Sequence, residues 1–234
     1  GTLNIILFKA FYESSPENFP MGFSAFVSYI WMQQAFLAFF AMWTFESDIT
    51  DSIVSGSISY QMSKPISIYN LWFTRSVALR LARGLLRCFP VLIIASILPQ
   101  PYRLIMPDPI TFFIFIASMI LGLCTAAAFT CLIYVLCFFT VSPKGLQIVF
   151  FSASEMLMGQ IIPIPFFPET IKKILEFSPF TGIQNIPLRI FSYDILPADA
   201  GKKILLQVFW LLVLFLSGKI IARAAEKRLV VQGG

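Results

Sequence analysis

Several separate apolar segments constrain this chain of 234 residues more than any other feature. A helix needs about 20 predominantly apolar residues to cross the hydrocarbon core of a bilayer. The longest segment, Thr111 to Val141, has no formally charged residue. Over the whole chain 58% of the residues are hydrophobic and 12% are charged, whereas about 25% are charged in soluble domains. The sequence therefore predicts an all-α integral membrane protein, with a single membrane domain over residues 1–234.

Hydropathy and turn signals predict six transmembrane helices. We expect the first to be truncated here, with only its far half in residues 3–11, because that run is too short to cross a bilayer. The others are residues 23–45, a span ending at Leu98, and residues 111–141, 146–162 and 204–221. Ten of the seventeen basic residues then share a side with both termini. Because basic residues concentrate on the cytoplasmic side, both termini are predicted to be cytoplasmic.

Three polar side chains fall inside predicted spans. Gln33 and Gln34 need hydrogen-bond partners within the helix bundle, because lipid offers none. Glu155 lies within an apolar run, where an ionisable group is either a functional site facing a wet cavity or a protonated packing residue. The sequence leaves both readings of Glu155 open.

Arg80, Arg83 and Arg87 follow one another at helical spacing where the third span begins. Arginines at such a place commonly extend to the headgroup level, which makes them interfacial basic residues. A path for an anionic substrate or a lipid site is the alternative.

The polar interval from Glu46 to Pro65 separates the second and third spans and carries its own helix signals. Asp48 can cap a short helix, and Asp51 adds a negative charge in the first turn. Gly56 is a suitable stop. The sequence therefore predicts a helix of about two turns outside the membrane, although a plain loop on the headgroups remains possible.

One face of this short helix is apolar, with Ile49, Ile53 and Val54 close together. An apolar stripe that its own chain does not bury indicates a docking surface.

The interval from Pro163 to Lys203 is too broken by prolines to be a span. It predicts an amphipathic helix with Pro168 as its first residue and Phe177 as its last, and a second short piece at Ile183–Phe191, both in the outer interface or dipping into it.

Several kinds of chemistry lack the residues they need. The chain contains no histidine, which excludes histidine-based catalysis and histidine metal sites. No phosphate-binding Gly-rich motif ending in Lys-Ser/Thr occurs. The four cysteines lie in apolar runs without metal-ligand spacing, so they are expected to pack as small hydrophobes. We therefore predict neither a catalytic nor a metal site, and the basic residues at span ends indicate orientation rather than nucleic-acid binding.

Three patterns together resemble the permease subunits of bacterial ATP-binding cassette (ABC) type 2 exporters, in their small six-span branch. The first is the segment from Asp48-Ile49 through Gly56 to Lys64-Pro65. The second is Met158-Gly159-Gln160 with the proline-rich run to Pro168, followed by Ser178-Pro179-Phe180 and Pro187. The third is the order of spans and connectors. Unlike the family pattern, this chain has no amphipathic cytoplasmic helix before the first span, and we expect that segment to precede Gly1.

The resemblance implies a cytoplasmic coupling helix between spans two and three and re-entrant outer helices between spans five and six. The coupling residues would be Asp48, Ile49, Asp51, Ile53, Val54 and Gly56. An outer gate would include Pro163, Pro165, Phe167, Pro168, Pro179, Phe180 and Pro187.

The implied function is ATP-driven export of a hydrophobic or amphipathic substrate by alternating access. The chain would bind no cofactor, since ATP and Mg would sit on a separate nucleotide-binding ATPase subunit. Its other partners would be a second permease subunit, the same or related, and membrane lipid, in a bacterial cell membrane. The alternative is an ATP-independent secondary transporter or channel that uses Glu155.

Overall fold

The computed structural model describes residues 2–14, 16–58 and 67–226, and within them every regular element is helical. The predicted segment's end at Lys64-Pro65 lies outside the described residues. The α-helices are α1 (Thr2–Ser14), α2 (Phe23–Ala35), α3 (Leu37–Phe40), α4 (Ser47–Val54), α6 (Ile68–Ile97), α7 (Pro109–Leu136), α8 (Pro143–Leu157), α9 (Glu169–Phe177), α10 (Ile186–Phe191) and α11 (Pro197–Glu226). Shorter helical turns are η1 (Pro16–Asn18), η2 (Cys137–Phe139), η3 (Ile164–Phe166) and the π-helix η4 (Thr181–Asn185).

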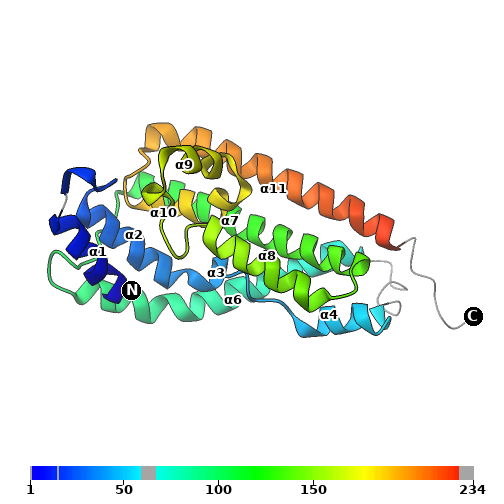
Figure 1. Cartoon of the computed structure of the whole chain (residues 1–234). Helices are drawn as coiled ribbons and strands as arrows, with labels where there is room; N and C mark the ends of the chain where they lie inside the picture. Colours follow the sequence, from blue (N-terminus) through cyan, green and yellow to red (C-terminus); the bar gives the residue numbers. More distant parts are fainter. Residues whose placement is uncertain (1, 15, 59–66, 227–234) are drawn as a thin grey trace, which may run out of the picture.

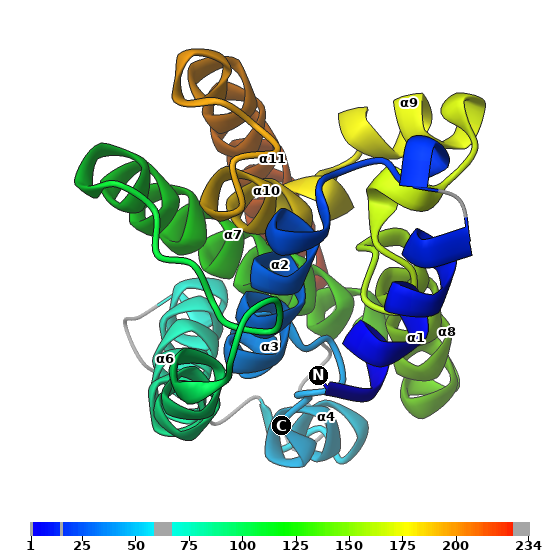
Figure 2. The ribbon, with the colours of Figure 1, turned by 90° about the vertical axis from the view of Figure 1, so that its left-hand side faces the viewer.

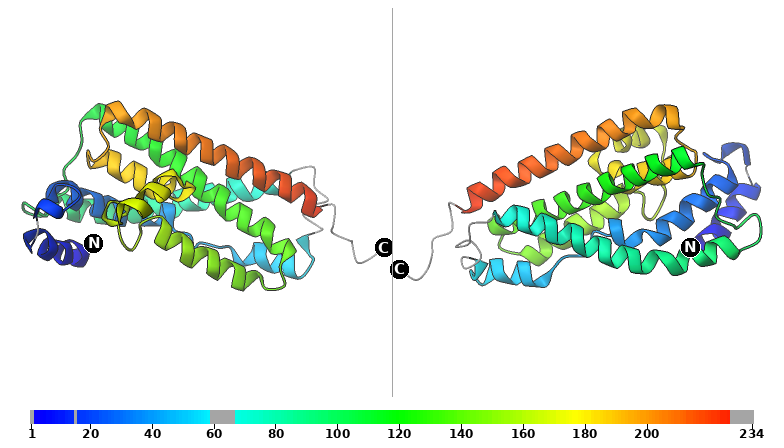
Figure 3. Two further views of the ribbon diagram at one scale, coloured as in Figure 1. Left: turned by 45° about the horizontal axis from the view of Figure 1, so that its top comes forward. Right: turned by 180° about the vertical axis from the view of Figure 1, so that it is seen from behind.

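The long helices run roughly along one axis and form an elongated bundle (Figures 1 and 3). One end, which we call the α4 end, carries α4 and the turn into α8. The opposite end, called the far end, carries the α6–α7 loop and the starts of α2 and α11. Viewed along the axis, α2 lies centrally, with α6 and α7 on one side and α1 and α8 on the other (Figure 2).

Helix α7 is the centre of the packing and contacts α6, α10, α11 and η4. Its three consecutive alanines, Ala126 to Ala128, are fully buried, and small side chains allow helices to approach closely in membranes. The core around α7 therefore depends on short side chains as much as on its many aromatic rings.

Within the described residues, two helices are long and apolar enough to cross a membrane, at Pro109–Phe139 and Pro197–Glu226. Helix α11 leaves large apolar side chains exposed, among them Leu205 at 70% and Leu216 at 53%, as expected for a lipid-facing helix. Helix α8 has 15 residues, about 22 Å at 1.5 Å per residue, which is less than the roughly 30 Å of a hydrocarbon core. The structure thus identifies two of the six predicted spans by length and composition.

Two predicted helix ends are wrong. The second span was expected to be continuous from Phe23 to Phe45, but the helix breaks at Phe36 and α3 ends at Phe40. The fifth was expected to reach Ile162, but α8 ends at Leu157, and Gly159 follows with a φ of +78°. Side chains from neighbouring helices hydrogen-bond to the backbone at both helix ends. Helix propensity, which is read along the sequence, cannot reveal such contacts.

Candidate functional site: the α4 surface and the polar contacts behind it

Helix α4 confirms that the polar interval contains a short helix. The predicted N-cap at Asp48 is wrong by two residues, since Glu46 is the N-cap residue and Asp48 lies in the first turn. Gly56 has a φ of +74°, and its N–H donates to Ile53 O at 3.3 Å. A left-handed glycine after the last turn is a common helix stop, so the predicted end is confirmed.

The apolar stripe of α4 is divided between the protein interior and the surface. Ile49 is 2% exposed and belongs to a buried cluster with Trp72 and Tyr134. Ile53 packs partly against that cluster, whereas Val54 is 67% exposed. The expectation that the chain cannot bury this stripe is therefore wrong for Ile49, because α6 and α7 reach the α4 end and cover it.

An ion-pair cluster joins α4 to α6. The Arg75 guanidinium contacts Glu46 and lies 3.6 Å from Asp48. Burial raises the pKa of the Glu46 carboxyl, and the positive charge of Arg75 only partly offsets that effect.

Hydrogen bonds join the same helix to α7 and α8. The Glu46 N–H donates to Tyr134 Oη at 2.7 Å, and Gln147 Nε2 donates to Thr50 Oγ1 at 2.8 Å. Helix α4 is thus bonded to three helices of the bundle, so a displacement of α4 would pull on α6, α7 and α8.

The exposed part of α4 lies beside the turn into α8, across a hollow. Val141 on that turn is fully exposed, and a hollow of about 280 Å³ separates it from α4. The hollow is lined by Ile53, Val54, Cys137, Phe138, Thr140, Val141 and Pro143. Asp48 and Asp51 are exposed on the same helix. We call Asp48, Asp51, Val54 and Val141 the α4-end surface.

Arg80 is not an interfacial residue, which corrects the prediction. It is 2% exposed, and its guanidinium donates to the carbonyls of Phe39 at 3.0 Å and Ala41 at 2.7 Å and to Thr130 Oγ1 at 2.8 Å. These carbonyls belong to the end of α3, which has no following turn to bond them. A buried charge replaces the missing helical partners.

Glu155 approaches the same break from the opposite side. It is 8% exposed, and Oε1 accepts a hydrogen bond from the Met42 N–H at 3.5 Å. The peptide bond between Ala41 and Met42 therefore binds Arg80 through its oxygen and Glu155 through its nitrogen. The Arg80 and Glu155 side chains thus hold one irregular segment between α6 and α8.

The remaining intramembrane polar and basic residues differ in their surroundings. Gln33 Nε2 donates to the carbonyls of Gly159 at 3.2 Å and Gln160 at 3.4 Å, which confirms that it finds a partner inside the bundle. Gln34 is half-buried and makes no hydrogen bond among the described residues. Arg83 and Arg87 are exposed, so they lie on a different face of α6 from Arg80.

The residues predicted for an outer gate lie in two places. Pro163 and Pro165 are buried in and beside η3, followed by half-buried Phe167 and exposed Pro168. Pro179 and Phe180 are half-buried before η4, and Pro187 is buried in α10. Phe180 packs against Phe129 of α7. The first group adjoins α9 and the second adjoins α7, so they do not form one cluster.

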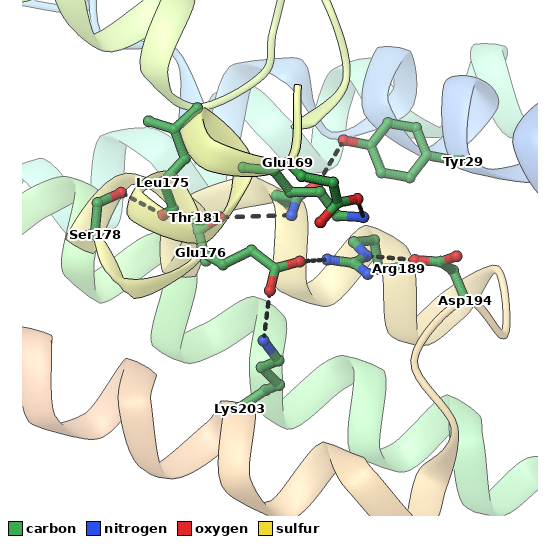
Figure 4. A network of polar contacts seen from close by, with 11 residues as sticks. Tyr29, Glu169, Leu175, Glu176, Ser178, Thr181, Arg189, Asp194 and Lys203 are labelled. Carbon is green, nitrogen blue, oxygen red and sulfur yellow. Dashed lines mark hydrogen bonds and ion pairs between the residues drawn. The ribbon is translucent and has the colours of Figure 1, made fainter. Parts of the chain in front are cut away.

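A chain of four charged side chains joins α9, α10 and α11 (Figure 4). The Arg189 guanidinium binds Glu176 at 2.7 Å and also Asp194, and Lys203 lies 3.4 Å from the other Glu176 oxygen. Burial alone would raise the pKa of Glu176, but the hydrogen bond and charge of Arg189, with Lys203, lower it overall.

The π-helix η4 is fixed to two long helices. Pro187 has no N–H to offer the carbonyl of Ile183 four residues earlier, so regular α-helical bonding is interrupted there. Gln207 Nε2 of α11 donates to Gly182 O at 2.7 Å and to Ser118 O at 3.1 Å. On α7, a Cβ at Gly122 would lie 2.2 Å from Ile183 O.

A family model described as an ABC-2 family transporter protein matches residues 2–233. The chain belongs to this family. Comparison with curated proteins and with solved structures gives no significant match. ABC-2 membership and the apolar helices identify a membrane-embedded permease subunit of an ABC transporter, a class of assembly that includes an ATPase partner. Among the described residues, no group of three His, Cys, Asp or Glu side chains is arranged to hold a metal ion.

Sequence reasoning missed the residues that attach α4 and its neighbours in this ABC-2 permease. The sequence did contain one usable signal, because the buried positions Trp72, Ser76, Arg80, Gly84 and Cys88 repeat every four residues along α6. That spacing places Arg80 on the same helix face as the small residues Ser76 and Gly84, and it places Arg83 on another face. The contacts of Gln147 and Gln207 had no local signal, since their partners are distant in sequence.

Proposed function

We propose that this chain is the transmembrane subunit of an exporter in which a separate ATPase docks on the α4-end surface. The observation that carries the proposal is the construction of α4. Its buried side is bonded to α6, α7 and α8, while Val54, with Val141 across the hollow, is left exposed. A surface of this kind can receive a partner on one side and pass its movement to the bundle on the other.

The proposed mechanism is alternating access in a dimer of six-span permease subunits, with both termini cytoplasmic in a bacterial cell membrane. ATP and Mg act on the partner ATPase, whose closure displaces α4. The outer turns around Pro163–Pro168 and Pro179–Pro187 serve as the gate, and the substrate is hydrophobic or amphipathic. Support comes from the family match and from the apolar composition of the chain.

The test is co-purification with an ATPase subunit encoded alongside the chain. Val54→Lys removes exposed apolar surface and adds a positive charge beside the negative Asp51. We therefore expect loss of the complex with the ATPase. Leu196→Lys is the matched control, because Leu196 is also exposed, at 57%, but directly precedes α11, which starts at the far end. Equal recovery of the ATPase with both variants would refute docking at this surface.

A Glu155-dependent secondary transporter is the second candidate, since Glu155 is a buried carboxylate with a long hydrogen bond of 3.5 Å. It requires gradient-driven flux from the chain alone in liposomes. Flux that persists without ATPase and is abolished by Glu155→Gln would support this candidate over the exporter.

A further inference from the structure

An apolar groove lies between α2, α6 and α7 in the half of the bundle towards the far end. Its volume is about 430 Å³, and its lining includes Met32, Phe36, Phe89, Ile93, Phe112 and Phe115. Ser96 contributes the one hydroxyl of the lining, and that hydroxyl donates to Leu92 O of its own helix at 2.7 Å. The groove therefore offers hydrocarbon surface and no free polar group to an occupant.

The groove leads from the outer surface of the bundle to its core. Phe89 and Ile97 on the rim are 62% and 78% exposed, whereas Phe115 and Phe191 on the floor are 1% exposed. In the part of the chain that the structure describes, helix α7 is one of two helices with the length and hydropathy of a span. The opening of the groove consequently faces the hydrocarbon region of the bilayer.

The size of the groove favours a narrow occupant. A helix is about 10 Å across with its side chains, so about 430 Å³ holds roughly one helical turn. A helix from a second copy would need a contact much longer than this groove provides. A single extended acyl chain, in contrast, matches a narrow cleft lined only by hydrocarbon.

A cation, Arg103, immediately precedes Leu104, which is a lining residue of this groove. Leu104 lines the floor, and its N–H donates to Ala95 O at 2.9 Å, which fixes the α6–α7 loop against α6. The adjacent Arg103 is exposed and has no ion pair or hydrogen bond among the described residues. Asp108, the nearest carboxylate along the loop, is engaged by Thr111 and Tyr193.

We propose that the groove binds one phospholipid, with an acyl chain between α2, α6 and α7 and the phosphate on Arg103. Arginine matches phosphate both in charge and in hydrogen-bond geometry. The site goes beyond the proposed transport function, because it requires neither the ATPase nor the α4-end surface. The occupant comes from the leaflet at the far end of the bundle.

Native mass spectrometry of the purified chain, without ATPase or nucleotide, measures the binding. The delipidated protein is titrated with phosphatidylglycerol, with neutral diacylglycerol of the same acyl chains, or with glycerol phosphate. We expect one phosphatidylglycerol per chain, much weaker binding of the diacylglycerol, and none of glycerol phosphate. Equal binding of diacylglycerol and phosphatidylglycerol would overturn the role of Arg103.

Two pairs of variants locate the site. Ser96→Trp fills the groove and should abolish binding. Ile94→Trp should retain it, because Ile94 is exposed two residues earlier on α6 but does not line the groove. Arg103→Gln should weaken binding about tenfold, the loss expected for one charge-assisted contact, and Arg87→Gln should not. Thermal unfolding of each variant checks that it is folded.

Equal lipid retention by the two tryptophan variants would overturn the proposal. So would a change from dimer to monomer in Ser96→Trp with lipid binding intact, since the groove would then be an interface between two copies. Neither result would bear on ATPase docking, which is measured separately.

Discussion

Arg80 and Glu155 show how single residues can stabilise an irregular backbone inside a bundle. The segment after α3 cannot satisfy its own carbonyls, and an unpaired buried backbone group costs about as much as a lost hydrogen bond. Arg80 supplies donors to Phe39 O, Ala41 O and Thr130. The guanidinium of Arg80 can stay charged in the interior because several hydrogen-bond acceptors surround it.

Replacing Arg80 with methionine should destabilise the chain by about 3 kcal/mol, because removing one partner leaves buried groups unpaired. The measurement is the apparent melting temperature in detergent. Arg83→Met is the control, since Arg83 is exposed on the same helix. Equal melting temperatures for the two variants would contradict the assigned role of Arg80.

At the scale of elements, the position of η4 depends on close contact with α7. In Gly122→Ala the new Cβ would lie 2.2 Å from the backbone oxygen of Ile183, and overpacking of this kind typically costs about 1–3 kcal/mol. Gly201→Ala is a matched control in α11, where a Cβ meets nothing within 4 Å. We expect a lower melting temperature for the first variant and an equal or higher one for the second, because alanine favours a helix.

The contact between α9 and α10 should depend on pH through Glu176. Its pKa in the folded chain lies below the ordinary value of 4.5, so the unfolded chain binds the proton more readily. The stabilisation is complete above pH 4.5 and is lost as the pH falls through the lowered folded pKa. Stability measured against pH should show this acid loss, and Glu176→Gln should reduce it.

Glu169→Gln provides the comparison for that measurement. Glu169 is also on α9, but its side chain is 74% exposed, whereas that of its partner Lys172 is 24% exposed, and an ion pair with so exposed a carboxylate contributes little. If Glu176→Gln loses as much stability at acid pH as the unaltered chain does, the assigned role of the Glu176 ion pairs is contradicted.

At the scale of the whole molecule, the sequence predicted the helical class, the short helix at α4 and helix α9, which ends at Phe177 as predicted and begins one residue after the predicted Pro168. Those features depend on local periodicity, prolines and caps. The end of α3 at Phe40 and the burial of Arg80 involve contacts across about 40 residues of sequence, which local patterns do not encode. The ring of Phe39 packed against Gly84 is a contact of the same kind.

The orientation of the molecule gives the widest test of the proposed docking surface. Cysteines introduced at Val54 and Val141 should react with a membrane-impermeant maleimide from the same side, because both lie exposed at the α4 end. Cysteines at Leu196 and Ile105 should react from the opposite side. Cys88, Cys131 and Cys137 are buried and Cys124 is half-buried, so labelling of the unaltered chain gives the background.

The excess of basic residues on the side of the α4 end predicts that Val54 and Val141 are labelled from the cytoplasm. An ATPase that consumes cellular ATP can reach α4 only from that side. Labelling of these two positions from outside the cell would place the α4-end surface beyond the reach of any such ATPase. Docking would then have to be abandoned, whereas the packing of α4 on α6, α7 and α8 would stand unchanged.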